Sequence, residues 1–119
     1  MSDLIYLASP YTHVDMLVRC QRAMQAAHTA ARLVEKGYFV YSPVLHGHEI
    51  DKWASDIPYQ YWIDLGFKML SRCDLMYVLM IPGWRQSGGI KKEIEFAESN
   101  DIPISYYDPT SDSVQEYPS

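Results

Sequence analysis

LMYVLMIPGWRQSGGIKKEIEFA, residues 75–97, contains the pattern that decides the fold. Its first seven residues are all apolar, and a continuous apolar run of this length predicts a buried strand. A loop rich in glycine and serine follows, and helical periodicity begins near residue 89. A loop between a strand and a helix offers free backbone N–H groups and the positive end of a helix dipole, which suits an anion such as phosphate. The stretch therefore predicts a strand, an anion-binding loop and a helix.

Glu93 lies on the apolar side of this predicted helix. At about 100° per residue, Ile90, Ile94 and Ala97 define an apolar arc, and Glu93 falls inside it. A buried carboxylate is unfavourable unless it is paired or protonated, and burial raises its pKa. A raised pKa is useful in a catalytic group, so Glu93 is a candidate catalytic residue. The alternative is a partly exposed glutamate that is hydrogen-bonded to a loop amide.

The rest of the chain alternates between strand and helix patterns. Besides 75–81, strands are predicted at residues 4–8, 38–41 and 102–106, and helices at residues 14–36, 58–72 and from 89 onward. A strand, a helix and a strand within about forty residues are typical of a parallel crossover unit. We therefore predict an α/β fold: one doubly wound, mainly parallel sheet of about four to five strands with helices on both faces, of Rossmann or flavodoxin type. This domain spans residues 1–107, and residues 108–119 form a polar C-terminal tail that is expected to fray.

The first predicted helix has an apolar stripe of six residues at three- and four-residue spacing: Leu17, Cys20, Met24, Ala27, Ala31 and Val34. Cys20 and Cys73 both lie in such helical apolar patterns, and the sequence has no Cys-x-x-Cys pair. We therefore predict that both cysteines are reduced residues of the core.

Composition excludes several classes of function. The net charge of −5 argues against a nonspecific nucleic-acid binder, because no basic stripe balances it. No apolar run approaches 18 residues and no signal peptide is recognisable, so a soluble cytoplasmic protein without a membrane partner is expected. The glycine-rich loop is neither a Walker A sequence nor a GxGxxG fingerprint, and no cofactor is expected.

Ligands of doubly wound sheets bind at the carboxyl ends of the strands. We therefore expect three predicted loops to meet there: residues 9–11, the histidine-rich residues 46–53 and residues 83–89. His46 and His48 are two positions apart and no cysteine joins them, so we expect no metal there and favour contacts with a substrate. Trp84, next to Arg85, is placed to stack on a base.

Arg19 and Arg22, in the first half of the predicted first helix, are within reach of a phosphate bound near the loop after the first strand. The alternative is that they belong to a solvated face of the helix.

Three motifs together resemble the nucleoside 2-deoxyribosyltransferase-like superfamily. These are Tyr6-Leu7-Ala8-Ser9-Pro10-Tyr11, Cys73-Asp74-Leu75 and Gly89-x-x-x-Glu93-x-x-x-Ala97. The likeness covers residues 4–106 and is greatest to small bacterial and phage branches with a Gly-Trp-x-x-Ser-Gly-Gly-like loop. It implies the α/β fold predicted above, a small-molecule nucleoside or nucleotide as the ligand, and a homo-oligomer.

In this superfamily, the glutamate at the Glu93 position attacks the anomeric carbon of the sugar and displaces the base. The resemblance implies the same role for Glu93 here. Deoxyribosyltransferases tend to carry aspartate at the position of Ser87, whereas nucleoside 5′-monophosphate N-glycosidases tend to carry serine. By this resemblance Ser87, Gly88 and Gly89 would bind a 5′-phosphate. The residues that would line the base and sugar pocket are Tyr6, Ser9 and Tyr11.

The chain departs from the superfamily at two places. An aspartate often precedes the position of Asp74 by eight residues, where this chain has Gly66. Asp64 is two positions earlier, which is roughly 200° away on a helix. The assignment of a general acid therefore stays open among Asp64, His46 and His48. The C-terminal segment that reaches a neighbouring subunit's site in the superfamily is not recognisable in residues 108–119.

The sequence thus predicts an enzyme that cleaves or exchanges the N-glycosidic bond of a (deoxy)nucleoside or a nucleoside 5′-monophosphate, with Glu93 and Asp64 as its catalytic residues. The alternative is a nucleotide-binding or sensing module of the same fold without catalysis, which Gly66 favours.

Overall fold

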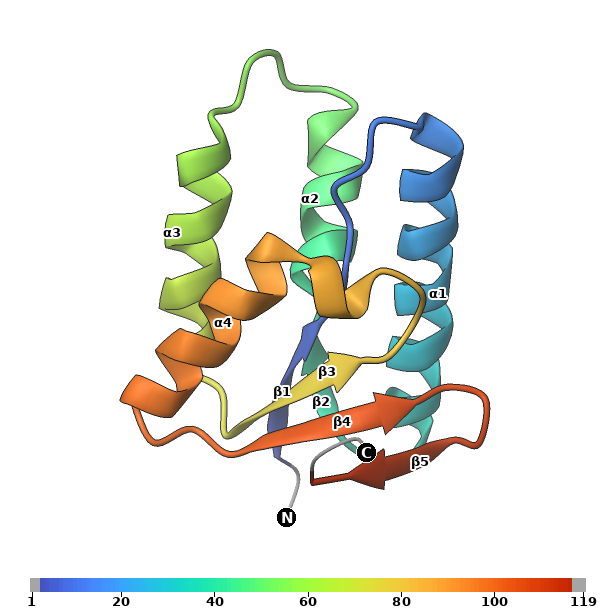
Figure 1. Cartoon of the computed structure of the whole chain (residues 1–119), viewed down its shortest axis with the longest axis vertical. Coiled ribbons are helices and arrows are strands. Elements are labelled where there is room, and N and C mark those ends of the chain that lie inside the picture. Colours follow the sequence, from blue (N-terminus) through green and yellow to red (C-terminus); the bar gives the residue numbers. More distant parts are fainter. Residues whose placement is uncertain (1–2, 117–119) are drawn as a thin grey trace.

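The computed structural model describes residues 3–116, which form five strands and four α-helices (Figure 1). The strands are β1 Leu4–Ala8, β2 Phe39–Tyr41, β3 Leu75–Leu79, β4 Ile104–Asp108 and β5 Ser113–Gln115. The helices are α1 Met16–Glu35, α2 Pro43–Asp51, α3 Tyr59–Leu70 and α4 Gly88–Ser99, and the short 3₁₀ helix η1 Trp84–Gln86 precedes α4.

The strands form one sheet in the order β2-β1-β3-β4-β5. Neighbours are parallel except β5, which runs antiparallel to β4. The last four residues of both β1 and β3 are buried, as expected for central parallel strands covered on both faces. The predicted fold class is confirmed, including the single sheet and the helices on both of its faces.

Local signals set the boundaries of α1 and α4. The Asp15 side chain accepts a hydrogen bond from the Leu17 amide at the start of α1, and Gly37 follows its end with a φ of 98°. Ser87 caps α4 in the same way, since its Oγ accepts from the Ile90 amide at 3.1 Å. Both helices therefore begin directly after a loop at the carboxyl end of a strand.

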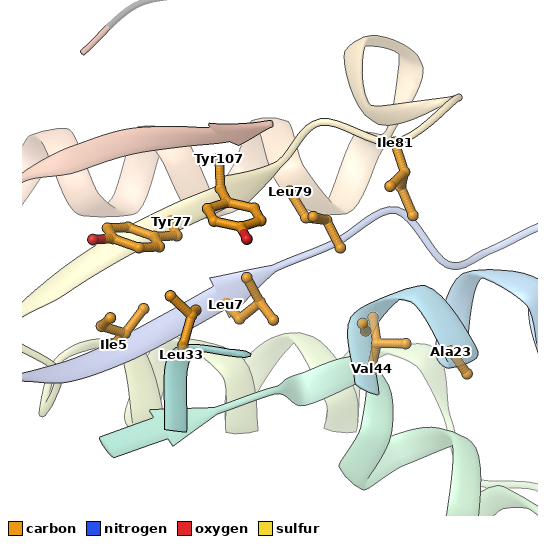
Figure 2. Close-up of a cluster of buried hydrophobic side chains, with 10 residues drawn as sticks. Ile5, Leu7, Ala23, Leu33, Val44, Tyr77, Leu79, Ile81 and Tyr107 are labelled. Carbon is orange, nitrogen blue, oxygen red and sulfur yellow. The ribbon is translucent and has the colours of Figure 1, made fainter. Parts of the chain in front are cut away.

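One face of the sheet packs against α1 and α2. Figure 2 shows this core, in which Ile5 and Leu7 of β1 point toward Leu33 of α1 and Val44 of α2. Tyr77 and Tyr107 extend it across β3 and β4, with ring centroids 6.4 Å apart. Alternate residues of β1 thus serve this core, and the others face the opposite side.

The opposite face packs against α3 and α4 through Tyr6, Ala8 and the alternate residues of β3. Phe67 of α3 and Phe96 of α4 stack with ring centroids 4.6 Å apart, which joins the two helices. Tyr6, in the middle of β1, therefore packs beneath α3 and α4.

Two segments differ from the sequence prediction. Residues 43–51, read as part of a loop, form α2, whose Ser42 cap accepts a hydrogen bond from the Leu45 amide at 3.2 Å. Residues 113–115, assigned to a fraying tail, pair with β4 as the edge strand β5. Residues 117–119 of that tail lie outside the described part of the chain.

The apolar stripe on α1 faces solvent rather than the core. Leu17, Met24 and Val34 are 70%, 59% and 57% exposed, and Cys20 is exposed as well. The prediction that Cys20 is a core residue is therefore wrong, whereas Cys73 is buried as predicted. The residues of α1 that face the sheet are instead Ala23, Ala26, Thr29 and Leu33. Among residues 3–116, no helix is long and apolar enough to cross a membrane.

Candidate active site

A cavity of about 890 Å³ opens at the carboxyl ends of β1 and β3. The chain crosses over in opposite directions from these two neighbouring strands, so this is the topological switch point where α/β sheets bind ligands. Ser9 and Tyr11, which follow β1, contribute to its wall, and so does the segment 86–89 before and at the start of α4. The expected meeting of these two loops is confirmed.

Glu93 reaches the floor of the cavity from α4 and is only partly exposed there. The hydroxyl of Tyr6 donates a hydrogen bond to its Oε2 at 2.5 Å. Tyr6 itself is fully buried and belongs to β1, so a strand residue fixes the position of a helix residue 87 positions later. The predicted inward position of Glu93 is confirmed.

Burial raises the pKa of Glu93 to about 7, although the hydrogen bond from Tyr6 acts in the opposite direction. Burial, followed by the charge of Glu93, raises the pKa of the Tyr6 hydroxyl well above its ordinary range. Tyr6 therefore remains a proton donor to the carboxylate at every physiological pH. The Glu93 carboxyl therefore exchanges its proton near neutral pH, and perturbed pKa values of this kind cluster at functional sites.

Gly66 of α3 lies against the Tyr6 hydroxyl. A Cβ atom at this position would be 2.9 Å from Tyr6 Oη, which is closer than real Cβ contacts allow. The glycine therefore leaves space for the hydroxyl that contacts Glu93.

The first turn of α4 presents its backbone to the cavity. Ser87, Gly88 and Gly89 all line the wall, and a Cβ on Gly88 would meet no atom within 4 Å. The first amides of a helix have no intrahelical acceptors, and the dipole makes this end positive. The arrangement has the chemistry of an anion site.

Two polar side chains from the other side of the cavity point to the same chemistry. The hydroxyl of Ser9 is buried and has no hydrogen-bond partner within residues 3–116. Arg22 of α1 donates to the carbonyl oxygens of Thr12 at 3.0 Å and Pro82 at 3.5 Å, and it forms no ion pair in this part of the chain. Arg22 thus joins the loops after β1 and β3 and brings an uncompensated positive charge to the wall. Arg19 instead donates to the His13 carbonyl.

Tyr11 and His48 form a pair on the α2 side of the cavity. The Tyr11 hydroxyl and His48 Nδ1 share a hydrogen bond at 2.6 Å, so Nδ1 is engaged by the tyrosine. Val44, Gly47, His48 and Asp51 line the cavity at helical spacing. The sequence singles out His48 but predicts a loop here, so it does not identify Val44 and Gly47 as part of the site, although Ser42-Pro43 is a recognisable helix start.

An aromatic and aliphatic wall completes the site. Tyr41 at the end of β2 and Trp62 and Ile63 of α3 line the cavity beside Tyr59. Gly47 of α2 lies next to the Trp62 ring of α3, and a Cβ there would be 3.6 Å from the ring, an ordinary van der Waals distance. Tyr41 was not predicted as a site residue, since its strand gave no signal that its end meets α3.

Three predicted site residues do not line the cavity: Asp64, His46 and Trp84. Asp64 is exposed and accepts a hydrogen bond from Gln60 at 2.8 Å. His46 packs behind the wall between the rings of Tyr41 and Trp62, with centroid distances of 6.0 and 6.4 Å.

Trp84 packs on Tyr106 at a centroid distance of 5.6 Å and carries the Arg85 guanidinium 4.5 Å above its ring. Within residues 3–116, no group of three histidine, cysteine, aspartate or glutamate side chains is placed to hold a metal ion.

A family model described as "Domain of unknown function (DUF1937)" matches residues 3–109. The chain belongs to the DUF1937 family. No curated protein matches this DUF1937 chain. Among solved structures, it is similar to a 2-deoxyribosyltransferase from the psychrotolerant bacterium Bacillus psychrosaccharolyticus, with a TM-score of 0.57 and 15% sequence identity over 89% of this chain and 72% of that chain. At this identity the likeness shows that the DUF1937 chain has a deoxyribosyltransferase-like fold.

Proposed function

We propose that this protein cleaves or exchanges the N-glycosidic bond of a nucleoside 5′-monophosphate or a (deoxy)nucleoside, with Glu93 as the nucleophile. The observation that carries the proposal is the hydrogen-bonded Tyr6–Glu93 pair on the floor of a cavity of about 890 Å³. The fold shared with a 2-deoxyribosyltransferase supports the same class of reaction.

In the proposed first step, a Glu93 carboxylate oxygen bonds to the anomeric carbon of the sugar. The bond from that carbon to the base nitrogen breaks, its electron pair leaves with the base, and a proton neutralises the base. Water or a second base then attacks the same carbon and releases the Glu93 carboxylate. Tyr6 holds the carboxylate in position and, by donating to Oε2, favours its ionised form.

A 5′-phosphate is the favoured substituent of the sugar. The free amides at the start of α4, beside Ser87, suit its negative charge. The unpartnered Ser9 hydroxyl and the Arg22 guanidinium add a hydrogen-bond donor and a positive charge to the same cavity. A base would occupy the wall of Tyr41, Trp62 and Ile63, where an aromatic ring can stack.

His48 is the proposed donor of the proton to the departing base. Of the three candidates from sequence, it alone lines the cavity, and its Nδ1 is fixed by the Tyr11 hydroxyl. A second ring nitrogen therefore remains for the ligand.

The proposal is tested by incubating the protein with a panel of nucleosides and nucleoside 5′-monophosphates and separating the products by chromatography. Glu93→Gln should reduce release of free base by at least a thousand-fold while ligand-induced thermal stabilisation persists. The matched control is Glu95→Gln, on an exposed position of the same helix, which should act like the wild type. Unchanged turnover in Glu93→Gln would disprove the nucleophile.

The second candidate function is a nucleotide-binding module without catalysis. It is favoured by the position of Asp64, which is exposed and does not line the cavity, so the predicted catalytic aspartate is missing from the site. This module would be stabilised by nucleotides in both the wild type and Glu93→Gln, and neither protein would release free base.

A further inference from the structure

Helix α2 presents two polar side chains to the cavity, one helical turn apart. His48 and Asp51 both line it, and their spacing of three residues places them on the same face of the helix. The side chain of Asp51 forms no hydrogen bond or ion pair within residues 3–116. An ionised carboxylate accepts hydrogen bonds and cannot donate one, so Asp51 offers an unused acceptor to a ligand.

The neighbours of His48 determine which of its ring nitrogens carries the proton. Its Nδ1 shares a hydrogen bond of 2.6 Å with the Tyr11 hydroxyl. Burial raises the pKa of Tyr11, so the phenol keeps its proton, although the charge of Arg19 and a hydrogen bond from it act in the opposite direction. Because Arg19 donates to the tyrosine oxygen, the Tyr11 proton is directed to Nδ1 of His48. The proton of the neutral imidazole then lies on Nε2, and His48 offers an N–H donor to a ligand.

The donor lies nearer the floor of the cavity than the acceptor does. Helix α2 begins directly after β2 and leads away from the sheet, and α3 leads back to it (Figure 1). A Cβ on Gly47 would be 3.6 Å from the Trp62 ring, so the adjacent His48 is level with the proposed wall for the base. Asp51 is three residues further along the helix, or roughly 4.5 Å more distant from the sheet. Glu93 lies below both side chains, at the floor.

This order of donor and acceptor matches only some bases. With the glycosidic bond at the Glu93 end, the exocyclic group on the opposite side of the base points toward Asp51. In cytosine and adenine this group is an amino donor, and the adjacent ring nitrogen is an acceptor. In uracil, thymine, guanine and hypoxanthine it is a keto oxygen, and the adjacent ring nitrogen carries a proton. Only the amino bases complement a donor at His48 and an acceptor at Asp51.

We propose that the site selects nucleotides of the amino bases, cytosine or adenine, over those of the keto bases, and that His48 and Asp51 determine this specificity. The inference rests on the proposed function for the orientation of the base, and it names the class of substrate. A keto base would place its oxygen against the Asp51 carboxylate and its ring N–H against the His48 N–H. Both contacts are repulsive and leave polar groups unpaired, which is an effective way to reject a ligand of the same shape.

Two pairs of ligands isolate this difference. CMP and UMP, and likewise AMP and IMP, differ only in the amino or keto group and in the proton on the adjacent ring nitrogen. Dissociation constants are measured by isothermal titration calorimetry in the Glu93→Gln background, where no turnover is expected. The amino member of each pair should bind roughly ten-fold more tightly, or better. Equal affinities within a pair that binds, or tighter binding of UMP or IMP, would overturn the proposal.

Asp51→Asn assigns the preference to its residue. The carboxamide can turn its NH₂ group toward a keto oxygen, so the preference should fall below about three-fold. The matched control is Glu49→Gln, which removes a carboxylate from an exposed position of the same helix outside the cavity wall and should keep the full preference. A preference that is unchanged in Asp51→Asn would contradict the role of Asp51.

Tyr11→Phe tests the tautomer of His48. Without the hydroxyl, Nδ1 can carry the proton and leave Nε2 as an acceptor, so UMP and IMP should bind more tightly relative to CMP and AMP. Tyr61→Phe, at an exposed position outside the cavity wall, is the control and should keep the ratio of the parent protein. An unchanged ratio in Tyr11→Phe would contradict the role of the His48 N–H.

These outcomes are distinct from those that test the proposed reaction, which depends on base release by the wild type. An amino preference without base release would support this inference together with the non-catalytic module. Equal binding and equal base release for amino and keto nucleotides would support the reaction and overturn this inference. A protein that bound none of the four nucleotides would overturn both.

Discussion

The Tyr6 hydroxyl and Glu93 Oε2 lie 2.5 Å apart, and this contact joins the central strand β1 to the helix α4 at the floor of the cavity. Tyr6 is fully buried, so its hydroxyl has no water as an alternative partner. The pair sets both the position and the proton affinity of Glu93.

Removing this hydroxyl should change the pH dependence of the protein. In Tyr6→Phe, the pKa of Glu93 should rise above about 7, because the hydrogen bond from Tyr6 lowers it in the wild type. A rise of about one unit would reduce the ionised fraction at pH 7 about five-fold, and turnover with it. Base release measured from pH 5 to 9 should recover at high pH. A Tyr6→Phe profile that coincides with that of the wild type would show that the contact has no influence on the carboxyl.

The same carboxyl should make stability depend on pH. Because the pKa of Glu93 is raised from 4.5 to about 7 in the folded state, the folded protein binds the proton more tightly than the unfolded chain. The stabilisation from this proton is fully present below pH 4.5 and is lost as the pH rises toward 7. Relative to Glu93→Gln, the wild type should lose on the order of 2 kcal/mol of unfolding free energy across that interval. Urea unfolding of both proteins at several pH values measures this difference, and a constant difference would argue against a raised pKa.

Gly66→Ala tests the steric relation between α3 and Tyr6. The added Cβ would come within 2.9 Å of Tyr6 Oη, so the hydroxyl or the helix has to move. We expect a loss of about 1–3 kcal/mol in the free energy of unfolding and weaker turnover. The matched control is Gly88→Ala, where the Cβ would meet nothing within 4 Å, and its stability should stay within about 0.5 kcal/mol of the wild type. Equal effects of the two substitutions on stability would contradict this explanation of Gly66.

Ser9→Ala separates binding from folding. The buried Ser9 hydroxyl has no partner within residues 3–116, so its removal should leave the stability unchanged or higher. Its removal should nevertheless weaken the thermal stabilisation by nucleoside 5′-monophosphates, because the hydroxyl is proposed to contact the ligand. Ser42 is a buried serine with a structural role, and Ser42→Ala should cost about 1 kcal/mol by removing the cap of α2. Nucleotide stabilisation of Ser9→Ala equal to that of the wild type would remove Ser9 from the proposed site.

Sequence by itself determined the features that depend on neighbouring residues. The continuous apolar runs at residues 4–8 and 75–81 identify central strands, because only strands buried on both faces lack polar residues. Ser87 before Gly88 marks the start of α4, and the helical period alone turns Glu93 inward. These signals act over a few residues, so the fold class and the succession of β3, loop and α4 could be predicted, whereas α2 and β5 could not.

Other features depend on contacts between segments that are distant in the sequence, and only the tertiary structure decided these. The apolar arc of helix α1 is wider than its contact with the sheet, and packing on the sheet buries Ala23 and Leu33 and leaves Met24 exposed. Gly47 favours a loop when the sequence is considered alone, but in the structure it belongs to α2 and lies next to Trp62 of α3. The partner of Glu93 is a strand residue 87 positions earlier, and no local period or propensity encodes that pairing. The physical reason is that a side chain becomes buried only when the helices pack on the sheet, so the side chains that contact one another there cannot be identified from any single segment.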